Sequence, residues 1–113
     1  MKATITLDDV AVEQGGDDPY ADLGLADSAA MLIKAQLARQ IGQIIRDQSL
    51  TQTQAAQLVG MPQPKLSEML RGHFRGVSQA KMIECLNRLG QDVDIVVKPA
   101  RQPQGGQTWV VVA

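Results

Sequence analysis

Apolar side chains recur at helical spacing through the middle of the chain and at alternate positions near its end. Between about residues 28 and 48 they fall on one face of a helix, as expected for an amphipathic helix packed on a core. Asp27 or Ser28 can cap its start. A long first helix, about 28–48, is therefore predicted. The positions on its apolar face are Ala30, Leu37, Ala38, Ile41, Ile44 and Ile45.

Local start and stop signals predict three shorter helices after this one. Thr51 and Gln54 are spaced as a capping box, in which each residue satisfies the other's backbone N–H, so a helix is predicted over 51–59. Two more follow at about 63–71 and 79–89. Their ends are marked by a glycine or a capping side chain: Gly60, Gly72, Ser78 and Gly90.

Beyond residue 90 the apolar period changes from that of a helix to that of a strand. The stretch QDVDIVVK places Val93, Ile95 and Val97 on one face, and TWVVV at 108–112 is a second strand candidate. Unpaired strand edges are unfavourable, so the two strands form a hairpin or one of them pairs with another subunit. The sequence leaves both arrangements open.

The first 19 residues differ in character from the rest. They open with the alternating run KATITL, which can form a brief strand, and continue into the acidic stretch DDVAVEQGGDDP, which has no helical period. We interpret residues 1–19 as a flexible acidic arm, 20–90 as a helical domain and 91–113 as a strand or hairpin that serves dimerisation. The fold class is mainly α, a compact bundle of four to five helices.

The spacing between residues 52 and 71 is typical of a helix-turn-helix unit. Such a unit needs a small residue where the helices touch, a turn residue that tolerates positive φ, and apolar anchors under the second helix. Ala56 and Gly60 meet the first two needs, and the anchors are Ala55, Val59, Met61, Leu66 and Met69. An unrelated helical bundle is the alternative interpretation.

The segment LTQTQAAQLVGMPQPKLSEMLRG resembles the helix-turn-helix of the Xre/Cro-repressor family. That family usually shows a Thr-Gln start, a Leu-Gly turn, a first-turn Gln in the next helix and a final Arg-Gly. The flanking stretches YADLGLADSAAMLIKAQLARQIGQII and FRGVSQAKMIECLNRLGQDVDIVVKP resemble the antitoxin-type branch, HigA-like proteins paired with RelE/HigB-type toxins. The resemblance covers about residues 20–99 and implies a lambda-repressor-like bundle. Family members commonly carry Ser or Thr where this chain has Pro62.

The resemblance also implies which residues contact DNA. It assigns a phosphate contact to the first residue of the second helix and a base contact to the first-turn glutamine of the third, here Gln52 and Gln63. A glutamine amide can pair with adenine N6 and N7. Lysine and arginine suit phosphate contacts, Ser67 can reach a base or a phosphate, and Glu68 can accept from cytosine N4 or pair with an arginine. The predicted DNA-binding residues are Thr51, Gln52, Gln63, Lys65, Ser67, Glu68, Arg71 and Arg75.

Charge is distributed unevenly along the chain, although the net charge is only −1. Residues 1–30 carry one cation against seven anions, a net charge of −6, whereas residues 31–90 carry eight cations against three anions, a net charge of +5. This is an acidic arm on a basic body. A RelE-like toxin would be small and basic, so the arm is its electrostatic complement.

Catalytic and metal-binding chemistry find no support in the sequence. The chain has one Cys and one His, and neither Cys85 nor His73 lies in a nucleophile or ligand motif. We predict no enzyme activity, no cofactor and no metal site. No apolar run approaches the ~18 residues of a membrane span, and the N-terminus lacks the basic start and apolar stretch expected of a signal peptide. A cytoplasmic protein is expected.

These observations predict a homodimeric repressor that binds a near-palindromic operator in double-stranded DNA, because one helix-turn-helix contacts few base pairs. The antitoxin-like reading adds a RelE/HigB-like toxin partner and autoregulation of the operon. A stand-alone Xre-type regulator without a toxin is the alternative. A protein-protein adaptor that has lost DNA binding is a third possibility.

Overall fold

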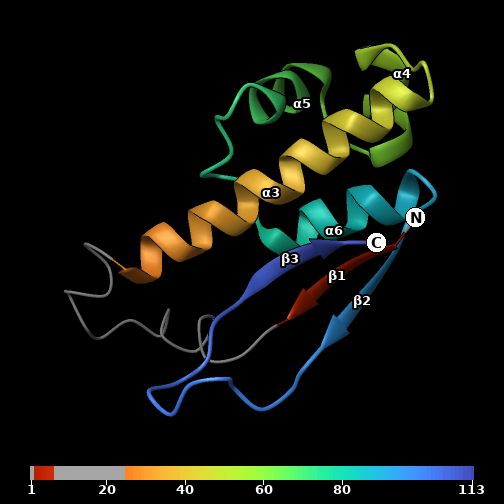
Figure 1. The fold of residues 1–113 in the computed structure, drawn as a ribbon. Coiled ribbons are helices and arrows are strands. Elements are labelled where there is room, and N and C mark those ends of the chain that lie inside the picture. Colours follow the sequence, from red (N-terminus) through yellow and green to blue (C-terminus); the bar gives the residue numbers. More distant parts are fainter. Residues whose placement is uncertain (1, 7–24) are drawn as a thin grey trace.

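The computed structural model describes residues 2–6 and 25–113, which form four helices and three strands in this part of the chain. The long helix α3 (Leu25–Asp47) lies between α5 (Gln63–Leu70) and α6 (Gln79–Arg88), as Figure 1 shows. The short helix α4 (Gln52–Val59) packs against α5 and α6. The helices predicted for this region are therefore confirmed, with ends that differ by at most three residues.

The largest of these differences is at the start of α3. The helix begins at Leu25, so Ser28 lies inside it and the prediction that Asp27 or Ser28 caps the helix is wrong. A capping side chain is a local preference, and a serine inside a helix costs only a few tenths of a kcal/mol relative to alanine. This small cost does not prevent α3 from beginning at Leu25 and continuing through Ser28.

The core is aliphatic and lies where the four helices meet. In α3 the fully enclosed side chains include Ile33, Leu37 and Ile41, of which Ile33 was missing from the predicted face. Ile44 is only partly buried. Cys85 is fully buried in α6, and this burial raises the pKa of its thiol.

A three-stranded sheet covers the side of the bundle formed by α3 and α6 (Figure 1). The strands are β1 (Lys2–Thr6), β2 (Asp92–Val96) and β3 (Trp109–Val112), and their order is β2-β1-β3. β1 pairs parallel to β2 and antiparallel to β3. The brief strand suggested by KATITL therefore occupies the centre of the sheet.

This order corrects the expectation for the C-terminal strands. Both strands form where the sequence predicts them, but they are not neighbours, so the hairpin alternative is wrong. β1 lies between β2 and β3, and it supplies the backbone hydrogen-bond partners that these two strands would have supplied to each other in a hairpin. The rest of the expected acidic arm, residues 7–19, lies outside the described residues. No helix within 25–113 is long and apolar enough to cross a membrane.

Candidate nucleic-acid interface

The start of α4 is fixed by a complete capping box. The Thr51 hydroxyl oxygen accepts from the Gln54 backbone N–H at 3.1 Å, and the Gln54 side-chain oxygen accepts from the Thr51 backbone N–H at 2.9 Å. Two backbone donors that the helix cannot satisfy internally are thus paired. The box places Gln52 at the first helical position, with its side chain exposed.

The start of α5 is fixed by two prolines instead of a capping side chain. Pro62 occupies the cap position without a side-chain hydrogen bond, and Pro64 stands in the first turn, where a missing N–H leaves no helical bond unmade. The fixed φ of each ring limits the freedom of the turn. Gln63, between them, is the first residue of the helix and is exposed.

The two predicted glutamines are in contact. The Gln63 Nε2 donates to the Gln52 Oε1 at 3.0 Å, which joins the N-terminal ends of α4 and α5. The turn that brings them together contains Gly60 at φ 70, a left-handed conformation that a residue with a Cβ adopts at a cost. The anchors Ala55, Val59, Met61, Leu66 and Met69 are all buried, as predicted.

The helix-turn-helix fold of this chain is also found in known proteins. A family model described as a helix-turn-helix domain matches residues 19–98. A solved structure entitled "Putative XRE Family Transcriptional Regulator" superposes with a TM-score of 0.70 at 31% sequence identity, covering 77% of this chain and 98% of that one. The chain belongs to the XRE helix-turn-helix family. A search of the curated proteins gives no match.

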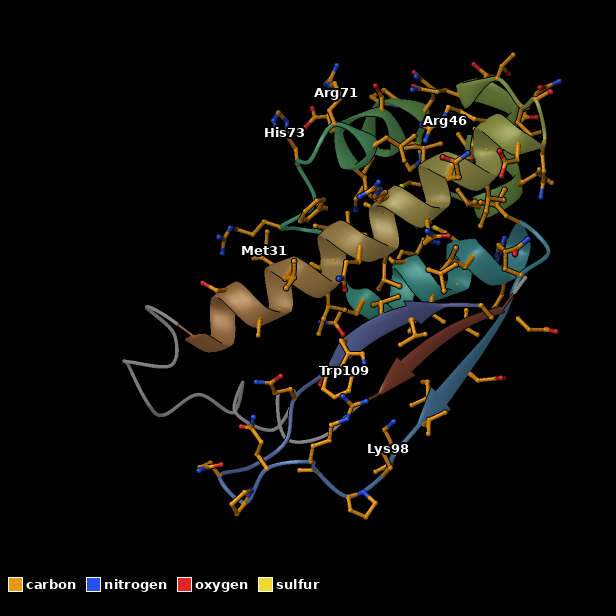
Figure 2. The ribbon with its side chains drawn as sticks, viewed as in Figure 1. Met31, Arg46, Arg71, His73, Lys98 and Trp109 are labelled. Atoms are coloured by element: carbon orange, nitrogen blue, oxygen red, sulfur yellow. The ribbon has the colours of Figure 1, made fainter. Side chains whose placement is uncertain are left out.

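Apart from Thr51 at the cap of α4, the other predicted DNA-binding residues of this XRE-family chain lie along α5 and the loop after it. Lys65 and Glu68 are exposed, whereas Ser67 is half-buried. Arg71 is the C-terminal cap residue of α5, and Arg75 lies exposed in the loop beyond it. Figure 2 places Arg71 at the end of α5, beside His73. The predicted residues thus extend from the paired glutamines to the far end of the same helix.

The loop after α5 is held against the bundle. Phe74 is 8% exposed and Val77 is 4% exposed, so both anchor the loop in the core. The Lys34 ammonium donates to the Arg75 backbone oxygen at 3.1 Å, which ties the loop to α3. The position of Arg75 relative to α5 is therefore set by packing from two sides.

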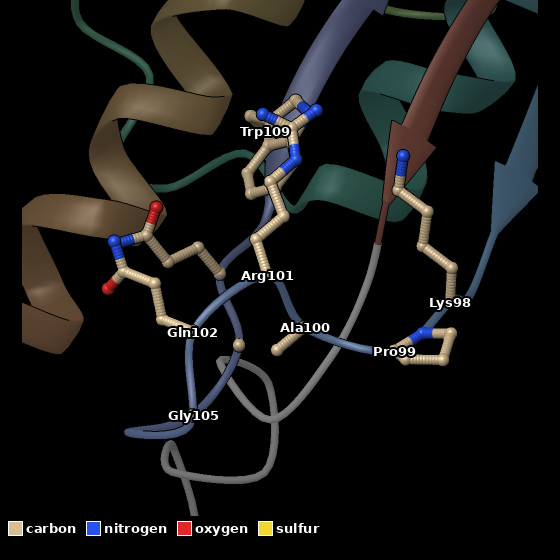
Figure 3. Close-up of a pocket in the computed structure, with 9 residues that line it drawn as sticks. Lys98, Pro99, Ala100, Arg101, Gln102, Gly105 and Trp109 are labelled. Carbon is tan, nitrogen blue, oxygen red and sulfur yellow. The ribbon is translucent and has the colours of Figure 1, made fainter.

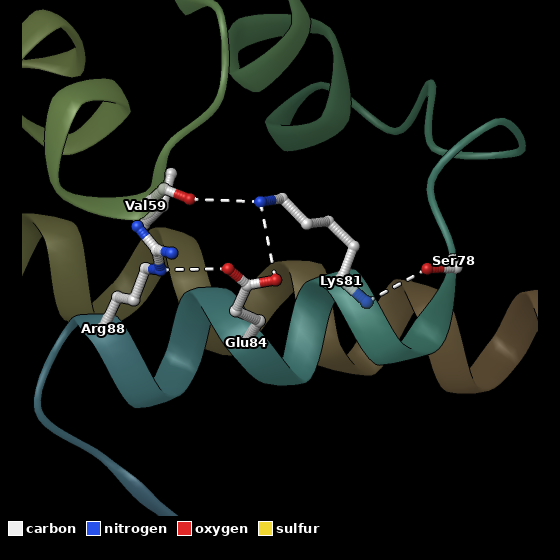
Figure 4. Close-up of polar contacts among 5 residues, drawn as sticks. All are labelled: Val59, Ser78, Lys81, Glu84 and Arg88. Carbon is white, nitrogen blue, oxygen red and sulfur yellow. Dashed lines mark hydrogen bonds and ion pairs between the residues drawn. The ribbon is translucent and has the colours of Figure 1, made fainter.

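Three charged residues of α6 support the helix-turn-helix, and sequence reasoning missed them. The Lys81 ammonium donates to the Val59 backbone oxygen at 3.3 Å, and Glu84 pairs with both Lys81 and Arg88, at 3.6 and 3.0 Å (Figure 4). The Arg88 guanidinium lies so close to Gly60 that an added Cβ there would be 3.1 Å from its Nη1. Cations at the end of α4 complement its dipole. Only the i, i+3 and i, i+4 spacing within α6 was visible in the sequence.

A separate pocket of about 320 Å³ lies in the β2–β3 connection, away from the helix-turn-helix (Figure 3). Its walls include Lys98, Pro99 and Trp109, and the Arg101 guanidinium lies 5.8 Å from the centre of the Trp109 ring, a cation–π contact. None of the predicted site residues lines it. Among residues 2–6 and 25–113 no group of three or more His, Cys, Asp or Glu side chains could hold a metal ion.

Proposed function

We propose that this XRE-family protein is a sequence-specific DNA-binding transcriptional repressor. The observation that carries the proposal is the amide pair between Gln52 and Gln63 at the tips of the two helices. A primary amide has two N–H donors and one acceptor oxygen. Gln63 gives one N–H to Gln52 and keeps the other N–H and its Oε1, which are the two groups that an adenine N7 and N6 require.

The same pair leaves the Gln52 amide group with its own N–H donors for a phosphate. Lys65, Arg71 and Arg75 supply further phosphate contacts, which fix the register of α5 in the major groove. Thr51 and Ser67 offer hydroxyl donors, and Glu68 accepts from a cytosine N4. Gln63 is thus the base reader, and the cations around it supply affinity without sequence preference.

The repressor acts as a homodimer on a near-palindromic operator. The outer edge of β2 has no strand partner within the described part of the chain, and Ile95, Val96 and Val97 are exposed there. Backbone pairing along this edge, together with α6, joins two copies about a two-fold axis. The sheet lies on α3 and α6, so this interface leaves α5 free for DNA.

We further propose that the repressor is the antitoxin of a type II toxin-antitoxin module, and that it binds and neutralises a basic RelE/HigB-like toxin. The supporting observations are the net charge of −6 over residues 1–30 and the resemblance of the flanking sequence to HigA-like proteins. A stand-alone XRE-family regulator without a toxin is the alternative. Co-purification with the product of an adjacent, Lys- and Arg-rich reading frame of about 100 residues supports the antitoxin, and its failure favours the alternative.

A binding experiment with three proteins tests the DNA-reading role. DNA duplexes are selected from a random pool by the full chain, and the affinity for the selected site is then compared for wild type, Gln63→Ala and Lys65→Ala. Gln63→Ala should cost about 1–3 kcal/mol on the selected site and relax the preference at one base pair. Lys65→Ala should weaken all sequences alike.

A salt titration of the wild-type complex is the companion measurement. The logarithm of the binding constant should fall with the logarithm of salt concentration by about 0.9 for each phosphate neutralised. If no duplex is retarded even at low salt, the adaptor role without DNA binding is the correct one. If DNA binds but neither substitution changes affinity, α5 is not the reading element.

A further inference from the structure

A groove of about 680 Å³ lies between α3 and α5 on the helix-turn-helix side of the molecule. Its lining includes Gln52 and Arg71, two of the predicted DNA-binding residues, together with Arg39 and Arg46 of α3. Figure 2 shows Arg46 on α3 and Arg71 at the end of α5. The groove therefore continues from the proposed reading surface onto a helix that sequence reasoning assigned no role in binding.

The charge of the groove has a single sign. Among residues 2–6 and 25–113, the charged residues that line it are Arg39, Arg46 and Arg71, and no carboxylate of this part of the chain lines it. The remaining lining is Gln52 and uncharged side chains such as Leu50, Leu70 and Phe74. Three guanidinium groups around one recess make a region of positive potential that attracts an anion.

One of these arginines is held in place without being neutralised. The Arg46 Nη2 donates to the Gln43 Oε1 at 3.0 Å, and the Gln43 amide in turn donates to Asp47 Oδ1 at 2.8 Å. The hydrogen bond to a neutral amide orients the forked guanidinium group of Arg46 and leaves most of its five N–H donors for a ligand.

We propose that the groove binds a phosphate group of the DNA backbone, with Arg46 as its principal ligand and Arg39 beside it. This inference rests on the proposed DNA-binding function and extends the interface from α4 and α5 onto α3. An arginine fork matches the geometry of a phosphate in two parallel hydrogen bonds. The continuity of the groove with Gln52 and Arg71 favours DNA over an acidic peptide as the occupant.

The test compares the full chain with Arg46→Gln, Arg39→Gln and Arg46→Lys on the selected duplex and on an unrelated duplex of equal length. Arg46→Gln should weaken both complexes by about eightfold at 0.1 M salt and reduce the salt slope by about 0.9, as the loss of one phosphate contact requires. Arg46→Lys should restore the slope but only part of the affinity, since the fork is lost. Lys98→Gln, which makes the same charge change in the β2–β3 connection, should leave the slope unchanged.

Two outcomes separate this inference from the proposed function. The groove proposal alone is overturned if three results occur together. Wild type binds DNA, Gln63→Ala relaxes specificity, and Arg46→Gln and Arg39→Gln both keep the wild-type salt slope. If Arg46→Gln tightens DNA binding, the groove holds an acidic segment in competition with DNA, and the phosphate assignment is likewise wrong. Thermal unfolding of each variant checks the fold. If Arg46→Gln is unfolded, the affinity and salt slope of Arg39→Gln provide the test instead.

Discussion

In the helix-turn-helix the side chains of Val59, Leu66 and Met69 are completely enclosed. In contrast, Ile95 of β2 is 50% exposed, and Val97, directly after that strand, is 74% exposed. The first region presents polar side chains such as Gln52 and Gln63 to solvent over a closed apolar core. The second presents apolar side chains and, at β2, a strand edge with no strand partner among the described residues. A polar face with a closed core suits a polar ligand, while an exposed apolar edge suits another protein.

The difference has its origin in how far apart along the chain the packing partners lie. Within the helix-turn-helix the anchors are separated by fewer than about 15 residues, and each helix carries its own cap and stop signals. The sheet is assembled from the two ends of the chain, with β1 at residues 2–6 between two strands beyond residue 90. The helix-turn-helix, here also called the reading unit (residues 51–71), is therefore specified by neighbouring residues, whereas the sheet is specified by distant segments.

The largest expected effect is on the closed core of the reading unit. Leu66→Ala removes a fully buried side chain and should lower the free energy of unfolding by about 2–5 kcal/mol, measured by urea denaturation. Leu58→Ala, at a 45% exposed position in α4, is the matched control and should cost less than about 0.5 kcal/mol. Equal losses for the two variants would mean that the anchor is not specifically packed.

A smaller effect is expected at the cap that begins the reading unit. Thr51→Ala removes the hydroxyl that accepts from Gln54 and should cost about 1 kcal/mol in the same assay. Thr51→Ser keeps the hydroxyl and should restore most of that loss. If Thr51→Ala is as stable as wild type, the capping box contributes nothing to the free energy of unfolding beyond what hydrogen bonds to water would contribute.

The smallest effect on unfolding is expected at the exposed edge of the sheet, where the consequence is for assembly instead. Val97→Asp should change the unfolding free energy of one chain by less than about 0.5 kcal/mol, because the side chain is 74% exposed. In the proposed homodimer it should bring like charges together and shift the chain toward monomer in sedimentation equilibrium. A Val97→Thr variant is the uncharged control. A dimer unaffected by Val97→Asp would move the interface away from β2.

Sequence patterns predicted the reading unit well because its determinants are local. Thr51 and Gln54 form the predicted box, Gly60 has the predicted left-handed conformation, and Pro62 caps α5 without a side-chain bond. The contact between Gln52 and Gln63 joins the two residues to which the family resemblance assigns DNA contacts. Each of these features depends on residues within a few turns of one another.

Other features needed the tertiary structure, because they join segments that no local pattern connects. The position of β1 between β2 and β3 depends on which strand end reaches which edge, and alternation of side chains does not encode that choice. The support of Val59 by Lys81 and the groove that unites Arg46 with Arg71 likewise depend on how α3, α4, α5 and α6 cross. The sequence by itself determined the helices, the caps of α4 and α6 and the exposed glutamines, since contacts between near neighbours fix them. Only the packing of distant elements decided the sheet order and the position of Arg39 and Arg46 beside α5, because those contacts exist only once the chain is folded.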